Sequence, residues 1–230
     1  MTIHYHGTPI TPSSVLETLG GRNFCVSYAN PGDIKRVHDL GQSVMLDNGA
    51  FTFWKRGEEA TVEWWTRYAE WAEPWLEYPT TWAVIPDVIG GTEAENDLLI
   101  AQWPRDLFGQ SAPVWHMNES LDRFRYLCHA WDKVCIGSSG EYATVGSSAW
   151  HRRMEAAMNA VCRNGVVPTW LHMLKGMATV DEGYPFASVD STDIARNHHL
   201  PQHIAARMAA RWDVMQCSPR WIHREQLTVV

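Results

Sequence analysis

Three aspartates in this chain each stand at the end of a short apolar segment. Asp47 ends VMLD (44–47), Asp87 ends WAVIPD (82–87) and Asp190 ends FASVD (186–190). A carboxylate beside buried residues is costly unless it is hydrogen-bonded, paired with a charge or used in a reaction. In a reaction, a carboxyl group serves as a nucleophile or as a general acid or base. The three aspartates are therefore the first candidates for a functional site.

Other polar residues follow apolar segments in the same way. The candidates that this placement adds are Asn48, Gly49, His116, Gly137, Ser138, Ser139, Gly140 and His172. Each of them also has a purely structural explanation. Asp and Asn favour turns for local reasons, so Asp47 could bond the backbone of the Asn48–Gly49 turn and Asp87 could cap the loop that follows it. The two histidines are as compatible with a core position as with a binding role.

The apolar segments alternate with helical patterns along the whole chain. Seven segments read as strands: FCVSY (24–28), VMLD (44–47), WAVIPD (82–87), PVWH (113–116), VCIG (134–137), VPTWLHM (167–173) and FASVD (186–190). An eighth strand could come from TIHYH (2–6) or from QLTVV (226–230). Alternation of this kind predicts a parallel sheet covered by helices. We expect a compact α/β barrel of the (β/α)8 type, formed by residues 1–230 as one domain, with the candidate residues together at the carboxyl ends of the strands.

Helix signals separate these segments. Trp64, Tyr68, Trp71 and Trp75 recur at spacings of four, three and four, which predicts one face of a helix. Similar faces are predicted over 121–131, 150–161 and 204–215. Asn30-Pro31 predicts a helix start with Gly41 at its end, and Thr92 with Glu95 predicts a capping box. An open doubly wound sheet is the rival architecture, but no glycine-rich GxGxxG turn follows the first strand.

The composition sets limits on the function. The chain has 230 residues, 45% of them hydrophobic and 20% charged, which is typical of a globular protein. No apolar run approaches the ~20 residues of a membrane helix, and the first residues do not resemble a signal peptide, so we expect a cytoplasmic protein with no membrane partner. The five cysteines form no CxxC pair and predict reduced thiols. A net charge of −7 argues against a general nucleic-acid coat protein, although residues 196–224 hold five arginines and one acid.

The order of the motifs resembles a known enzyme family. LDNGAF (46–51) resembles the DSGG-F/Y motif of the tRNA-guanine transglycosylases, and VDSTDIAR (189–196) aligns without a gap on that family's FDCVLPTR. PDVIGG (86–91) falls where the family carries its base-recognising aspartate, and GSSGE (137–141) resembles its base-binding loop. WLHMLKG (170–176) loosely resembles its YLMG strand, which adds Met173 to the base-binding candidates. The combination is most similar to the short, phage-encoded DNA 7-deazaguanine transglycosylases.

The resemblance implies a role for each matching residue. Asp190 matches the nucleophile, and Asp47 would be the acid/base or a base-contacting partner, the division of labour used by retaining glycosidases. Asp87 would accept hydrogen bonds from a guanine-like ring, and Gly137 with its neighbouring amides would address the other edge of that ring. The other residues expected to bind the base are Asn48, Gly49, His116, Ser138, Ser139, Gly140, His172 and Met173. The target nucleotide would have to leave the DNA helix to reach the site. Arg196 matches the motif arginine, and it could hold phosphates together with Arg207 and Arg211.

One departure from the family's motifs favours DNA over tRNA as the substrate. The CxCxxC-plus-His zinc site of the tRNA enzymes is missing, since only Cys217 and His223 lie near its place. We therefore expect guanine-containing DNA and a 7-deazaguanine base such as preQ0 as partners, with no metal and no cofactor. Three alternatives remain: activity on RNA, a non-catalytic module that binds deazaguanine or single strands, and a metal-dependent hydrolase of the amidohydrolase type. The last would use His4 and His6 with His116, His172 and Asp190 as a cage.

Overall fold

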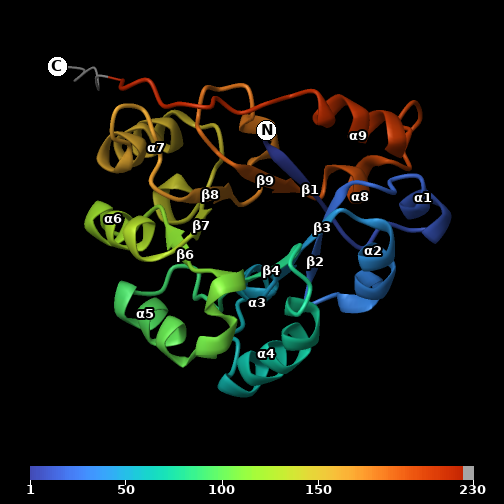
Figure 1. Ribbon diagram of the computed structural model, residues 1–230, viewed down its shortest axis with the longest axis horizontal. Coiled ribbons are helices and arrows are strands. Elements are labelled where there is room, and N and C mark those ends of the chain that lie inside the picture. The colour runs from blue at the N-terminus through green and yellow to red at the C-terminus, as the bar shows by residue number, and fades with distance from the viewer. Residues whose placement is uncertain (225–230) are drawn as a thin grey trace.

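The computed structural model describes residues 1–224, and within them the strands form a single parallel sheet (Figure 1). The strands are β1 (Ile3–Gly7), β2 (Asn23–Ser27), β3 (Ser43–Asp47), β4 (Thr81–Val84), β5 (Ser111–Ala112), β6 (Val114–His116), β7 (Lys133–Gly137), β8 (Trp170–Met173) and β9 (Ser188–Ser191). Their order in the sheet is β5-β4-β3-β2-β1-β9-β8-β7-β6. The segment 2–6 thus supplies a strand, and the other proposed strand, 226–230, lies outside the described residues.

The two ends of this sheet are consecutive in the chain, which nearly closes it into a barrel. β5 pairs with β4, β6 pairs with β7, and Pro113 alone stands between them. Proline has no N–H to give to a ladder, but its carbonyl accepts from the Cys135 N–H at 2.9 Å. Residues 111–116 therefore act as one strand that is interrupted at Pro113, and the nine strands of the sheet within residues 1–224 occupy the eight places of a (β/α)8 barrel. The predicted parallel α/β barrel is confirmed, with the 113–116 segment extended by two residues at its start.

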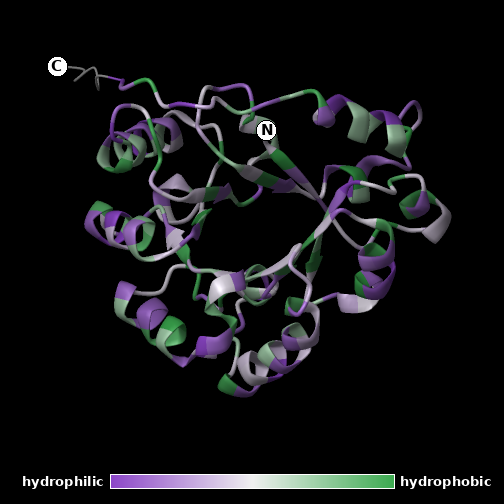
Figure 2. Ribbon diagram, in the orientation of Figure 1, coloured by the Kyte–Doolittle hydropathy of each residue, from purple (hydrophilic) through white to green (hydrophobic). Residues whose placement is uncertain are grey.

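Helices surround the sheet between successive strands (Figure 1). They are α1 (Ser13–Glu17), α2 (Ile34–Leu40), α3 (Ala50–Arg56), α4 (Val62–Leu76), α5 (Glu93–Gln102), α6 (Leu121–Ala130), α7 (Ser148–Val161), α8 (Asp193–Asn197) and α9 (Ala205–Asp213). Hydrophilic and hydrophobic residues alternate along them, as an amphipathic cover requires (Figure 2). No helix in the described range is long and apolar enough to cross a membrane.

The helix boundaries bear out most of the predicted signals. The capping box is present at the start of α5, where Thr92 Oγ1 accepts from Glu95 N–H and the Glu95 carboxylate accepts from Thr92 N–H. Asn30 differs from the prediction, because a 3-10 turn (Pro31–Asp33) precedes α2 and the Asn30 side chain makes no capping bond. In α4 the fully buried face is formed by Trp65, Tyr68, Ala72 and Leu76, while the other tryptophans of that helix are only half-buried.

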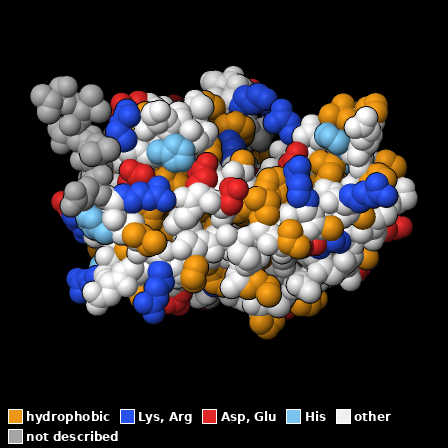
Figure 3. Space-filling model, turned by 90° about the horizontal axis from the view of Figure 1, so that it is seen from above, with side chains coloured by type: hydrophobic (Ala, Val, Ile, Leu, Met, Phe, Trp, Pro, Cys, Tyr) orange, Lys and Arg blue, Asp and Glu red, His pale blue; other side chains and the backbone are white. Residues whose placement is uncertain are grey.

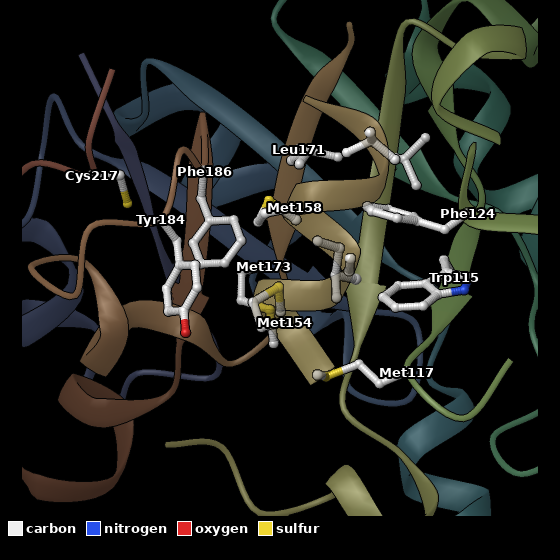
Figure 4. Close-up of a cluster of buried hydrophobic side chains, with 14 of the residues drawn as sticks. Trp115, Met117, Phe124, Met154, Met158, Leu171, Met173, Tyr184, Phe186 and Cys217 are labelled. Carbon is white, nitrogen blue, oxygen red and sulfur yellow. The ribbon is translucent and has the colours of Figure 1, made fainter. Parts of the chain in front are cut away.

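Alternation along the strands divides the core into an interior and an outer layer. The interior cluster is formed by Tyr5, Cys25, Met45, Trp82, Val84, Ala112, Val114 and Cys135. The Tyr5 hydroxyl accepts from Trp82 Nε1 at 2.9 Å inside it. Side chains one position along a strand point the other way, into two clusters between the sheet and the helices. Figure 4 shows the cluster beneath α6 and α7, where Met173 packs beside Met154 and Met158. The filled interior closes the barrel beneath its carboxyl edge.

Candidate functional site

A cavity of about 830 Å³ lies at the carboxyl ends of the strands. This volume is within the usual range of small-molecule sites. Asp47, Asp87 and Asp190 all line it, from β3, from the loop after β4 and from β9. The other predicted residues in its wall are Asn48, His116, Gly137, Ser138, Ser139, Gly140 and Arg196. The structure therefore brings most of the sequence-predicted residues to one cavity.

Asp190 is held firmly through one of its two carboxylate oxygens. Its Oδ1 accepts a hydrogen bond from the Lys175 backbone N–H at 2.6 Å and lies 3.3 Å from His172 Nε2. No residue in the range 1–224 donates to Oδ2. The residue is buried but lines the cavity. Asp190 thus has one oxygen fixed by the protein and one free for a ligand.

A chain of hydrogen bonds sets the orientation of His172 behind Asp190. Trp170 Nε1 lies 2.8 Å from Ser188 Oγ, and an indole N–H can only donate. Ser188 Oγ in turn lies 2.8 Å from His172 Nδ1. With Ser188 donating to Nδ1, the imidazole proton is on Nε2 and is directed at Asp190 Oδ1. The nucleophile candidate is therefore positioned by side chains from two adjacent strands, β8 and β9.

Asp47 has a different electrostatic environment. Burial raises the pKa of its carboxyl group from 3.8 to about 6, and the nearby Asp190 and Asp87 carboxylates add to the rise. Hydrogen bonds from the Ser27 side chain and the Gly49 N–H oppose it. A carboxyl group with a pKa near 6 can exchange a proton with a substrate close to neutral pH. Asp47 is thus suited to general acid and base chemistry.

Asp87 is held by an amide and lies beside an imidazole. Asn48 Nδ2 donates to Asp87 Oδ1 at 2.7 Å and to the Ile85 carbonyl at 2.8 Å. His116 Nε2 lies 2.9 Å from Asp87 Oδ2. All three side chains are buried. Asn48 therefore has two local roles, because its Oδ1 also accepts from the Ala50 N–H and so supports the turn into α3 while its amide orients Asp87.

The glycine-serine loop after β7 gives the cavity a backbone wall. A Cβ at Gly137 would lie 3.0 Å from His116 Nδ1, so a side chain there would crowd the imidazole. Gly140 has a φ of +56°, a conformation that glycine adopts without strain. The Ser138 hydroxyl accepts from Trp150 Nε1 at 2.9 Å, and Ser139 pairs with Asn118. Since both hydroxyls are engaged within the protein, the loop offers mainly its backbone to a ligand.

Three predicted base-binding residues take other positions. Met173 is fully buried in the outer core (Figure 4) and does not line the cavity. It is next to His172 in β8, so the two side chains point to opposite faces of the strand. His172 lies inside the barrel, against Tyr5 and Trp82, and reaches the site only through Asp190. Gly49 forms the turn before α3 with a φ of +83°. Their predicted contact with a base is therefore corrected to core packing, support of Asp190 and turn formation.

The predicted phosphate contacts divide into two groups. Arg196 is exposed and lines the cavity from α8. Arg207 and Arg211 lie on α9 and are absent from the cavity wall. The guanidinium of Arg211, 62% exposed, lies 3.4 Å from the Asp193 carboxylate. Figure 3, which views the molecule from above relative to Figure 1, shows lysine and arginine side chains dispersed among acidic and apolar ones.

The alternative metal cage does not assemble. His4 and His6 flank Tyr5 on β1, so they face away from the barrel interior, and their Nε2 atoms have no hydrogen-bond partner in the part of the chain that the structure describes. His116, His172 and Asp190 face the interior or the cavity instead. Within residues 1–224 no three or more His, Cys, Asp or Glu side chains are grouped as metal ligands. Two further histidines, His198 and His203, lie close together in the chain, and their rings bond backbone carbonyls.

Lys175 was not among the sequence candidates, although it lines the cavity. It follows β8 in a left-handed conformation with a φ of +57°, which brings its N–H to Asp190. Burial lowers the pKa of its amino group to about 8, while Asp190 and Asp47 act in the opposite direction. The signal available in the sequence was its place two residues after a predicted strand. Phe51, Thr52 and Trp54 of α3 also line the cavity and had no such signal.

No model of a known protein family matches this chain, and a comparison with curated proteins finds no match.

Proposed function

We propose that this protein exchanges guanine in DNA for a 7-deazaguanine base such as preQ0, as a transglycosylase that forms a covalent aspartyl-nucleotide intermediate. The observation that carries the proposal is the convergence of Asp47, Asp87 and Asp190 on one cavity of about 830 Å³. The three carboxyl groups differ in their contacts, which suits three different roles. The motif resemblance described above assigns the same roles to the same residues.

In the first half of the reaction, Asp190 Oδ2 attacks C1′ of the extruded nucleotide. The bond from C1′ to the guanine nitrogen breaks, its electron pair goes to the base, and protonated Asp47 supplies the proton. The free oxygen of Asp190 and the raised pKa of Asp47 support these roles. Guanine then leaves as a neutral base. The product at this stage is an ester between Asp190 and C1′.

In the second half, the incoming base takes the place of guanine. Asp47, now ionised, removes the proton from the nitrogen of the 7-deazaguanine that attacks C1′, and the bond to Asp190 breaks. Asp87 accepts hydrogen bonds from the N1–H and the exocyclic amine that guanine and deazaguanine share. Its fixation by Asn48 and the proximity of His116 support this recognition role. The reaction returns Asp190 to a carboxylate and Asp47 to its protonated form.

Nucleoside mass spectrometry tests the proposal directly. The protein is incubated with preQ0 and either duplex DNA, single-stranded DNA or RNA, each labelled in guanine, and the nucleic acid is then digested. We expect release of labelled guanine and a deazaguanine nucleoside in a DNA sample. The Asp190→Asn variant should keep the circular dichroism spectrum of the wild type and lose both signals. Exchange in RNA alone would replace the DNA assignment, and wild-type turnover by a folded Asp190→Asn variant would refute the nucleophile.

A further inference from the structure

Two exposed aromatic side chains stand beside the cavity on α3. Phe51 and Trp54 are 40% and 51% exposed, and their rings stack with centroids 5.6 Å apart and planes 26° apart. Both side chains line the cavity. Their spacing of three residues places them on one face of the helix. The intervening Phe53 points the other way and packs edge-to-face on Trp64 of α4, with centroids 4.6 Å apart. The helix is thus anchored by one aromatic residue and presents two others to solvent.

Cationic residues accompany this aromatic pair at the cavity. Lys175 Nζ lies 2.8 Å from the centre of the Phe51 ring. Lys55 is exposed on α3 and is close enough to Lys175 for its charge to contribute to the lowered pKa of that amine. Arg196 reaches the same cavity from α8. The mouth of the cavity therefore combines exposed rings and positive charges, in contrast to the three aspartates of its wall.

This combination has a recognisable binding chemistry. Bases of a single strand stack on exposed aromatic rings, and cations beside the rings hold the phosphates. A nucleotide that has entered the cavity must have neighbours along the strand, and these neighbours must lie at its mouth. We propose that Trp54, supported by Phe51, stacks the base next to the extruded nucleotide, and that Lys55 contacts the adjoining phosphate of this single-stranded segment. The inference rests on the proposed function, which places one nucleotide of the strand in the cavity. Binding of the strand is nevertheless measurable without base exchange.

Fluorescence anisotropy with a labelled single-stranded DNA oligonucleotide, in the absence of any incoming base, tests this surface. Loss of one base stack weakens binding by about tenfold to a hundredfold, which is the expectation for Trp54→Ala. Trp54→Phe keeps an aromatic ring and should recover most of the affinity. Lys55→Ala should reduce the slope of log Kd against log salt by about 0.7, the value for one phosphate contact on a single strand. The acids Glu58 and Glu59 follow α3 beyond Gly57, so Glu58→Gln with Glu59→Gln should tighten binding.

A matched control replaces one exposed aromatic and one exposed cationic residue elsewhere. Tyr126 is exposed on α6, and Arg163 is exposed in the connection into the amino end of β8, at the opposite edge of the barrel. The double variant Tyr126→Ala, Arg163→Ala should bind as the wild type does. Wild-type affinity of Trp54→Ala, or equal weakening by the control, would overturn the inference. If Trp54→Ala weakens binding while no exchange is ever detected, the surface stands and the proposed reaction falls. An RNA oligonucleotide that depends on Trp54 more strongly than DNA does would identify RNA as the strand.

Discussion

Removing the charge of Asp47 should stabilise this protein at neutral pH. The carboxyl group titrates at a pKa of about 6 in the folded chain against an ordinary value of 3.8, mainly because it is buried. A pKa difference of about 2 corresponds to about 3 kcal/mol of unfavourable free energy for the ionised form. Asp47 lines the cavity and keeps some contact with solvent, so we expect a gain of about 1 to 3 kcal/mol for Asp47→Asn at pH 7.5. The amide oxygen can still accept from the Gly49 N–H.

The sign of this effect fixes its pH dependence. Because the folded pKa is raised, the destabilisation is absent below about pH 4 and develops as the pH rises from 3.8 towards 6. Urea denaturation of the wild type and Asp47→Asn at pH 4, 6 and 7.5 should therefore show a difference that grows with pH. The exposed Asp39→Asn serves as the control and should stay within about 0.5 kcal/mol of the wild type. A loss of stability in Asp47→Asn at pH 7.5, or a gain independent of pH, would refute the reasoning.

Three further predictions test other parts of the structure. Ser188→Ala removes the partner of His172 Nδ1, so kcat for base exchange should fall about tenfold or more with little change in KM for the incoming base; an unchanged kcat would remove Ser188 from the positioning chain. The Tyr68 hydroxyl is within hydrogen-bond distance of the Leu46 and Val84 carbonyls, so Tyr68→Phe should lower the free energy of unfolding by about 1 kcal/mol, whereas the exposed Tyr126→Phe should not change it in the same denaturant titration. Arg207→Ala with Arg211→Ala should flatten the salt dependence of DNA binding by about one slope unit rather than two, because Arg211 is already paired with Asp193; an unchanged slope in anisotropy would exclude α9 as a DNA contact.

The sequence was sufficient to locate the edge at which the candidate residues meet. An acid after an apolar segment marks the carboxyl end of a parallel strand, and this reasoning holds for Asp47, Asp87 and Asp190 alike. The strand-helix alternation likewise predicted the barrel. Arg196 reaches the cavity because it lies just after the last strand. These results depend only on the order of elements along the chain.

The direction of individual side chains was harder to predict. β8 is buried on both sides, so its pattern does not say whether His172 or Met173 faces the barrel interior. The register with β9 decides it, since His172 lies opposite Ser188 and forms the hydrogen bond that makes it a support for Asp190. Lys175 reaches the cavity because its backbone is left-handed, a conformation that lysine rarely adopts and that the sequence does not signal. Such features depend on tertiary contacts between segments far apart in the chain.

The interruption at Pro113 gives the barrel a seam beside the site. β5 contributes two residues to the sheet and β6 three, so the ladders on both sides of Pro113 are short. Asp87 belongs to the β4 side of this seam and His116 to the β6 side, and the two side chains meet across it. Under the proposed function, a base that contacts both side chains would link the two sides of this seam. If the proposed function holds, we therefore expect a bound base to stabilise the barrel, and we expect the barrel without a base to open first along this line.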